Sequence, residues 1–272
     1  MKHVLIISLP LCVLTACSGG GGGTATAPTV VTVPALSQTA GDTEVAVEVS
    51  PGGDTITVTK SGGPEATSTL SAPDVGTYRT VFDDVGDYTF AFVSTGDGSV
   101  AGGATYEDGA EQTHGVFYER IGDTDLPTTG SATFTGDYLA MLIDPATGGT
   151  LIGAGITGNA SLTVDFAEST VSGEITDRGV YSLVSGDPFG SVSGVDPMML
   201  ELTSLSATGT FIGDASGGAI TSGMSVSTIS ASSFYSGLVA GADAGEAVGA
   251  VSALHTLGLE QFLEIGTFAA GH

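Results

Sequence analysis

Basic residues are scarce in this 272-residue chain, and their scarcity excludes a class of partners. Five lysines and arginines stand against 30 aspartates and glutamates, for a formal net charge of −25. Such a chain repels the phosphate backbone of nucleic acids and the surface of anionic lipids, so we expect no nucleic-acid partner. The charge fits two interpretations: a highly soluble surface, which is the simpler one, or attraction of a basic partner or of cations.

Cysteines and long apolar runs are equally scarce. The two cysteines are Cys12 and Cys17, and Cys12 falls within the expected signal peptide. The expected mature chain therefore has no disulfide, no cysteine nucleophile and no thiolate metal site. The apolar run Val4 to Leu14 is about 11 residues long, whereas a helix that spans a bilayer needs about 20.

The first residues have the pattern of a secretory signal, with a basic start, a short apolar run and small residues before Cys17. The sequence Leu14 to Cys17 resembles the bacterial lipobox. That resemblance implies that residues 1–16 are removed and that Cys17 is lipidated; Ser18 then implies the outer membrane. A multi-acyl anchor is stable where a single chain is reversible. The alternative is an ordinary signal peptide with an incidental cysteine.

The stretch after Cys17 predicts a flexible tether. Gly19 to Gly23 are five consecutive glycines, which do not pack and behave as a flexible coil. We expect residues 17–40 to be a lipid-anchored flexible tether.

Residues 131–272 predict an antiparallel β-barrel. Residues 161–166 and 171–176 alternate apolar and polar side chains around a short turn, which is typical of a hairpin. About eight such strands with short links favour a closed barrel, because closure removes exposed strand edges. A helix at 254–264 is an alternative to β structure there. The other expected strands are 132–138, 198–203, 205–211, 224–231, 233–240, 247–254 and 261–270, with bends at Gly136, Gly173 and Gly209.

Residues 41–122 predict a smaller β-domain that leans on the barrel like a handle, joined to it by a linker at 123–130. Four strands are expected, at 45–49, 56–58, 78–82 and 88–93, with turns at 51–54, 62–64 and 97–98. The fold class is therefore all-β, an eight-stranded antiparallel barrel preceded by a small sheet.

Four parts of the second half share their order and spacing with one family: 130–136, 162–167 with 171–175, 234–237 with 244–251, and 265–271. They resemble the β-barrel lipoproteins similar to transferrin-binding protein B. That family also includes the factor H-binding and haemophilin-type surface proteins. The resemblance implies a barrel beside a handle sheet, carried on the cell surface and binding a protein or a protein-carried ligand. It transfers no ligand residue, because the family's contacts lie on variable loops.

No catalytic or cofactor motif emerges from the residues. The three histidines outside the signal are scattered, whereas a zinc site needs clustered ligands. There is no nucleophile elbow, no phosphate-binding loop and no complete EF-hand loop, although aspartates in turns leave calcium as an alternative. Paired carboxylates at 83–84 and at 123 and 125 are better explained as turn residues. We expect neither an enzyme nor a bound cofactor or metal.

The expected role is therefore that of a surface-exposed outer-membrane lipoprotein that binds a partner without catalysis. Aromatic side chains are enriched at binding hot spots, and Phe189, Tyr118 and Tyr235 are the candidate contacts. The alternatives are a structural envelope lipoprotein without a dedicated ligand and, more distantly, a barrel enzyme.

Overall fold

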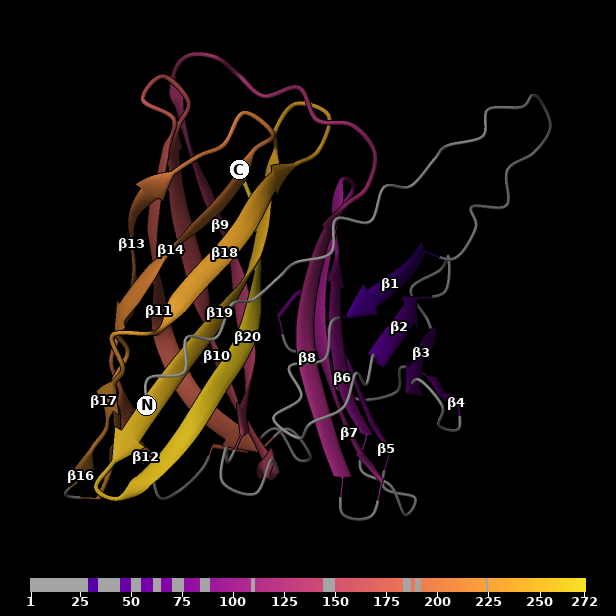
Figure 1. The fold of residues 1–272 in the computed structure, drawn as a ribbon, viewed down its shortest axis with the longest axis vertical. Helices are drawn as coiled ribbons and strands as arrows, with labels where there is room; N and C mark the ends of the chain where they lie inside the picture. Colours follow the sequence, from indigo (N-terminus) through magenta and orange to yellow (C-terminus); the bar gives the residue numbers. More distant parts are fainter. Residues whose placement is uncertain are drawn as a thin grey trace, which may run out of the picture.

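The structure is a computed structural model in which every regular element of the described residues is a strand (Figure 1). The described residues contain no helix long and apolar enough to cross a membrane. The signal residues 1–16 and Cys17 lie outside the described part, as do the expected turns at 51–54 and 62–64. The structure describes residues 29–33, 45–49, 55–60, 65–69, 76–83, 89–108, 111–143, 150–182, 187–188, 192–223 and 225–272.

Eight antiparallel strands close into a barrel, which confirms the predicted fold class. Each strand pairs with the next along the barrel wall, and β20 closes the ring by pairing with both β19 and β9. A closed ring leaves no exposed strand edge to template aggregation. The barrel strands, in wall order, are β9 (Ser131–Ile143), β10 (Thr150–Asp165), β11 (Thr170–Ser182), β13 (Met198–Ser204), β14 (Thr210–Gly217), β18 (Phe234–Ala240), β19 (Glu246–Leu257) and β20 (Glu260–Gly271).

The predicted hairpin is formed by β10 and β11, in register from Asp165 opposite Thr170. The carboxylate of Asp165 accepts the N–H groups of Ala167 and Glu168, each at 2.9 Å. An aspartate that bonds the backbone two and three residues onward stabilises a tight turn. This local bond explains why the chain reverses here after a period-two strand.

The glycines expected to bend the strands have two different roles. At Gly136 a Cβ atom would lie 2.0 Å from the carbonyl oxygen of Ala269, so only glycine permits that close approach of neighbouring strands. Gly209 instead has a φ of +78° in a turn. The expected strand at 205–211 is therefore wrong. Ser206 to Gly209 form a turn between β13 and β14, in which the Ser206 hydroxyl accepts the N–H of Thr210 at 3.0 Å.

The barrel interior is filled by its own side chains. The apolar members of each alternating strand point inward and join one continuous core. The largest completely buried residues in that core include Phe134, Tyr138, Ile156, Tyr235 and Phe268. An eight-stranded barrel has an interior just wide enough for such packing.

Short strands lie near the lower end of the barrel in Figure 1, where β12, β16 and β17 are labelled. The expected strand at 224–231 is split between two of these. The alternative helix at 254–264 is absent, because β19 and β20 meet there in a turn at Gly258. A three-stranded sheet is formed by β12 (Val192–Val195), β15 (Ile220–Ser222) and β16 (Ser225–Val226), and β17 (Thr228–Ile229) adds to β19.

Two four-stranded sheets precede the barrel, where we expected a single small one. The strands expected at 45–49, 56–58, 78–82 and 88–93 all exist, but β1, β4, β7 and β8 were missed. Residues 29–33 form β1, which pairs with β2, so the tether interpretation of 17–40 does not hold for them. One sheet is β1 (Thr29–Val33), β2 (Val45–Val49), β3 (Thr55–Lys60) and β4 (Glu65–Thr69); the other is β5 (Arg79–Asp83), β6 (Thr89–Thr95), β7 (Ser99–Asp108) and β8 (Glu111–Arg120).

The β5–β8 sheet packs against the outer face of barrel strands β9 and β20 (Figure 1). A second apolar core fills this contact, where Tyr78 and Phe92 meet Leu139, Met141 and Ile265. The hydroxyls of Tyr78 and Thr267 share a buried hydrogen bond of 3.0 Å. Where the sheet covers them, β9 and β20 are therefore buried on both faces, since one face lines the barrel and the other carries the sheet.

Candidate functional site at the junction of sheet and barrel

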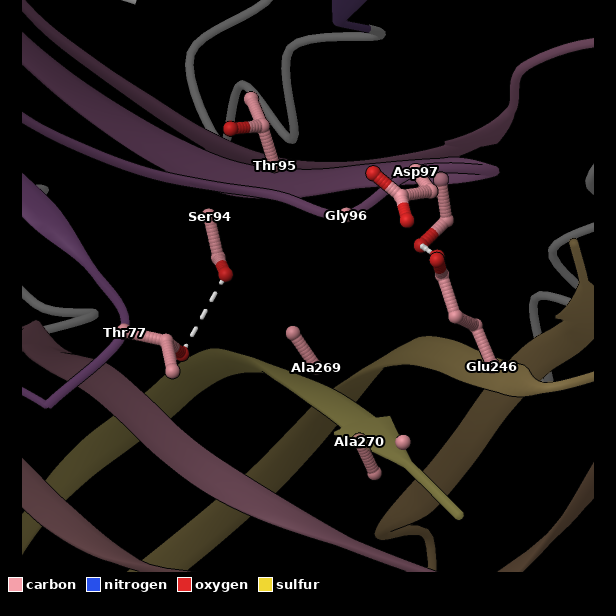
Figure 2. A pocket seen from close by; sticks show the side chains of 10 residues that line it. Thr77, Ser94, Thr95, Gly96, Asp97, Glu246, Ala269 and Ala270 are labelled. Atoms are coloured by element: carbon pink, nitrogen blue, oxygen red, sulfur yellow. Dashed lines mark hydrogen bonds between the residues drawn. The ribbon is translucent and has the colours of Figure 1, made fainter.

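A cleft of about 520 Å³ opens where the β6–β7 turn meets the barrel rim (Figure 2). Its walls come from Thr77, Ser94 and the turn residues on the sheet side. Ala269, Ala270 and Gly271 at the end of β20, together with Glu246 at the start of β19, form the barrel side. The cleft thus joins segments that lie more than a hundred residues apart in the chain.

Glu246 ties the turn to the barrel. Its carboxylate accepts the backbone N–H of Gly98 at 3.0 Å and the hydroxyl of Ser99 at 2.5 Å. Gly98 is required at this contact, because an added Cβ would lie 2.3 Å from the Cα of Gly241. The N–H of Gly96 also bonds the carbonyl of Ser99 at 2.8 Å, which closes the turn itself.

A second, smaller recess of about 220 Å³ lies along the same junction. Asp137 and Asp177 line it, together with Asn159, whose amide donates to Asp177 at 2.9 Å. Asp137 also accepts the N–H of Thr77 at 2.7 Å, so it fixes the chain just before β5.

The junction cleft has a polar lining. The described residues that line it offer carboxylates and hydroxyls, with no histidine, cysteine or lysine among them. Glu246 already accepts two hydrogen bonds, whereas Asp97, which also lines the cleft, is exposed. Such a lining fits a hydroxylated or cationic group of a ligand.

A second polar cluster is sealed inside the barrel around Glu264. Arg178 donates to both carboxylate oxygens, at 2.8 and 2.5 Å, and Nε2 of His255 lies 2.9 Å from Oε2. The hydroxyl of Tyr138 donates to Oε1 at 2.7 Å. All four residues are buried, and the His255 ring stacks on Phe262 at 4.9 Å.

Electrostatics keeps Glu264 charged despite its burial. Burial alone would raise the pKa of this carboxyl, but Arg178, His255 and Tyr138 outweigh burial and lower the pKa to about 2. Burial, and next the charge of Glu264, raise the pKa of Tyr138 well above its usual value, so its hydroxyl stays protonated and donates.

The same cluster holds the three-stranded sheet to the barrel. Nη1 of Arg178 donates to the carbonyls of Asp196 and Gly218, at 2.8 and 2.9 Å. The hydroxyl of Ser227 lies 3.4 Å from Nδ1 of His255 and accepts the N–H of Ile220 at 2.7 Å. Since it is enclosed by core side chains, this cluster positions structure and does not face a ligand.

The structure places the predicted site residues in different surroundings. Phe189 and the lipidation residue Cys17 lie outside the described residues. Tyr118 is half-buried on β8, and its hydroxyl donates to Ser236 of the barrel at 3.0 Å, so it sits at the junction. Tyr235 does not fit the expected contact role, because it is completely buried and its hydroxyl donates to the carbonyl of Glu201 at 2.6 Å.

The sequence patterns did not predict the buried cluster around Glu264. Its signal was present: Glu264 occupies an inward position between Phe262 and Gly266, and Arg178 is one of only five basic residues. A metal site is not formed by any group of three or more potential ligands within the described part of the chain. The ring of His272, an exposed residue, stacks on Phe134 at 5.5 Å.

Fold and site together define an all-β protein, a closed barrel with flanking sheets and a polar junction cleft. No protein-family model matches the chain, and no curated protein matches it. Among solved structures, intact Ap-TbpB (N and C lobes) is 11% identical with a TM-score of 0.42, covering 84% of this chain and 52% of that one. A variant of the vaccine antigen transferrin-binding protein B from Haemophilus parasuis Hp5 is 12% identical with a TM-score of 0.43, covering 84% and 50%. The chain spans about half the length of these proteins.

Proposed function

We propose that the protein is an outer-membrane, surface-exposed lipoprotein that binds a protein, or a ligand carried by a protein, without catalysis. The lipobox ending at Cys17 and the glycine run that follows it support the anchor and its location. The resemblance of residues 130–272 to barrel lipoproteins of the transferrin-binding protein B type supports the binding role.

One observation carries the binding role: the barrel's own side chains occupy its interior. Phe134, Tyr138, Ile156 and Tyr235 are among the buried core side chains that occupy it, beside the Glu264 cluster. Recognition therefore falls to the outer wall, the loops and the junction cleft, which suit a macromolecular partner better than a free small molecule.

The anchor and its exposure are tested on intact cells. Incorporation of a labelled fatty acid is expected in the natural chain and lost in Cys17→Ser. External protease is expected to digest the protein on intact cells. Protection of the protein on intact cells, with digestion after lysis, would contradict surface exposure.

The binding role is tested by capture from the native medium. Lipoprotein displayed on phosphatidylcholine vesicles is expected to retain one protein saturably, and excess free lipoprotein is expected to compete for it. Retention no greater than on bare vesicles would instead favour a structural envelope lipoprotein without a dedicated ligand.

A further inference from the structure

Four exposed apolar side chains lie on three neighbouring strands of the barrel wall. Leu202 is 71% exposed and Ile212 65% exposed, with Met199 and Phe234 also on the surface. They belong to β13, β14 and β18, which are adjacent in the wall (Figure 1). In most surface strands such positions are polar, so a concentration of this kind marks an interaction site.

A β-bulge in β13 creates this surface. Met199 pairs with Ser216, but Leu205 pairs with Phe211, so β13 has one residue more than β14 between these pairs. The ladder with β11 shifts at the same place. Consequently Glu201 and Leu202 are both exposed, although they are consecutive in the strand. Bulges re-aim side chains in this way and are common beside functional sites.

The bulge is held from within by Tyr235. The hydroxyl of this buried residue donates to the carbonyl of Glu201 at 2.6 Å and lies 3.4 Å from that of Val171. The hydroxyl of Thr203 donates to the carbonyl of Ile212 at 2.5 Å and joins the two strands beyond the bulge. Leu202 is thus presented on a fixed backbone, which lowers the entropy cost of binding.

The surface continues to the edge of the β5–β8 sheet. Ile212 pairs with Ser236, and Phe234 pairs with Asp214, which places both apolar side chains on the outer face of β14 and β18. Ser236 between them accepts the hydroxyl of Tyr118 from β8. Tyr118 therefore borders the surface, as an aromatic side chain that is half-buried in this structure.

The charges around the surface indicate the chemistry of its occupant. Glu174, Glu201 and Asp214 are exposed on the same three-strand region and its β11 neighbour. The nearby cation is Arg120, which already donates to the carbonyls of Val239 and Thr208. A second copy of this chain would bring like charges together, whereas a basic protein surface complements them.

We propose that Met199, Leu202, Ile212 and Phe234 form a docking surface for a protein partner that presents apolar side chains ringed by lysine or arginine. The proposal rests on the binding role proposed above and assigns it to this wall. Apolar contacts would supply affinity at the centre, and the carboxylates would select the basic partner and speed its approach.

The test uses a defined probe, a fluorescent peptide of alternating lysine and leucine, with the lipoprotein on phosphatidylcholine vesicles. We expect saturable binding that Leu202→Ser with Ile212→Ser weakens by about tenfold or more. Leu259→Ser is the matched control, since Leu259 is fully exposed in the β19–β20 turn, and it should bind like the natural chain. The melting curves of the natural chain, the double serine variant and the Leu259→Ser control should coincide, because exposed positions contribute little to stability.

Two further measurements separate the contribution of the apolar contacts to binding from that of the carboxylates. A lysine–serine peptide should bind about tenfold more weakly, and Glu201→Gln with Asp214→Asn should reduce the salt dependence of binding. Equal weakening by the Leu259 control, equal binding of both peptides, or a dimer in sedimentation that the double serine variant abolishes would each overturn the proposal.

The capture experiment tests the docking surface and the proposed function separately. A partner captured equally by the natural chain and by the double serine variant would leave the binding role standing and overturn this docking surface. Failure to capture any partner, with peptide binding intact, would count against the proposed function alone.

Discussion

Two carboxylates, Glu264 and Glu246, anchor different parts of this molecule, and their surroundings differ sharply. Glu264 is sealed in the barrel with a guanidinium, an imidazole and a phenol around it. Glu246 is half-buried at the junction, and its partners are a backbone N–H and a hydroxyl. The first carboxylate is fully committed to holding the fold together, whereas the second lines a cleft open to solvent.

The comparison teaches where the fold depends on single residues. Within the barrel, loss of one charge leaves another buried and unpaired, which costs about 3–5 kcal/mol. At the junction, water can replace a lost partner, so the same change costs only about 1 kcal/mol. Rigidity is thus concentrated in the barrel, and the attachment of the sheet is the adjustable part.

The largest effect is expected from Glu264→Gln. Loss of the carboxylate charge leaves Arg178 buried without a counter-charge and should lower the free energy of unfolding by about 3–5 kcal/mol. Guanidinium unfolding curves measure this. Glu260→Gln is the control, because it removes the same charge from an exposed position on the same strand. A similar loss of unfolding free energy in both variants would show that the buried cluster contributes no more to stability than an exposed carboxylate does.

The next effect is a loss of stability in acid. The pKa of Glu264 is about 2 in the folded protein, below its ordinary 4.5. A lowered pKa contributes stability that is complete above the ordinary value and is lost as pH falls from about 4.5 through about 2, here about 3 kcal/mol. The stability gap between the natural chain and Glu264→Gln should therefore narrow over that pH range. A gap that stays constant from neutral pH to about pH 2 would contradict the assignment.

The barrel was predictable from the sequence because its strands are amphipathic. The hairpin at 161–176 shows period-two alternation, and one face in the core with the other in water leaves a clear pattern. β7 was missed for the opposite reason. Its segment at 99–108 contains Gly102 and Gly103, and buried residues follow one another from Val100 to Ala104 without alternation. A strand covered on both faces loses the periodic signal.

The site was less predictable than the fold because it depends on register. Tyr235 was expected to be an exposed contact aromatic, yet its position in β18 turns it inward against Val171 and Glu201. A shift by one residue would reverse that direction. The β13 bulge was equally hidden: 198–203 alternates regularly in the sequence, and only pairing with both neighbours reveals the extra residue.

The smallest effect is expected at the junction, from Glu246→Ala. This change leaves the N–H of Gly98 and the hydroxyl of Ser99 to water, and it should cost about 1 kcal/mol of global stability. Amide exchange should show the change more clearly, because the β6–β7 turn should exchange faster while β10 and β11 keep their protection. Asp243→Ala removes an exposed acid three residues away and is the control. If exchange at Gly98 were the same in both variants, apolar packing around Tyr78 and Phe92 would hold the sheet unaided, and the junction would be as rigid as the barrel.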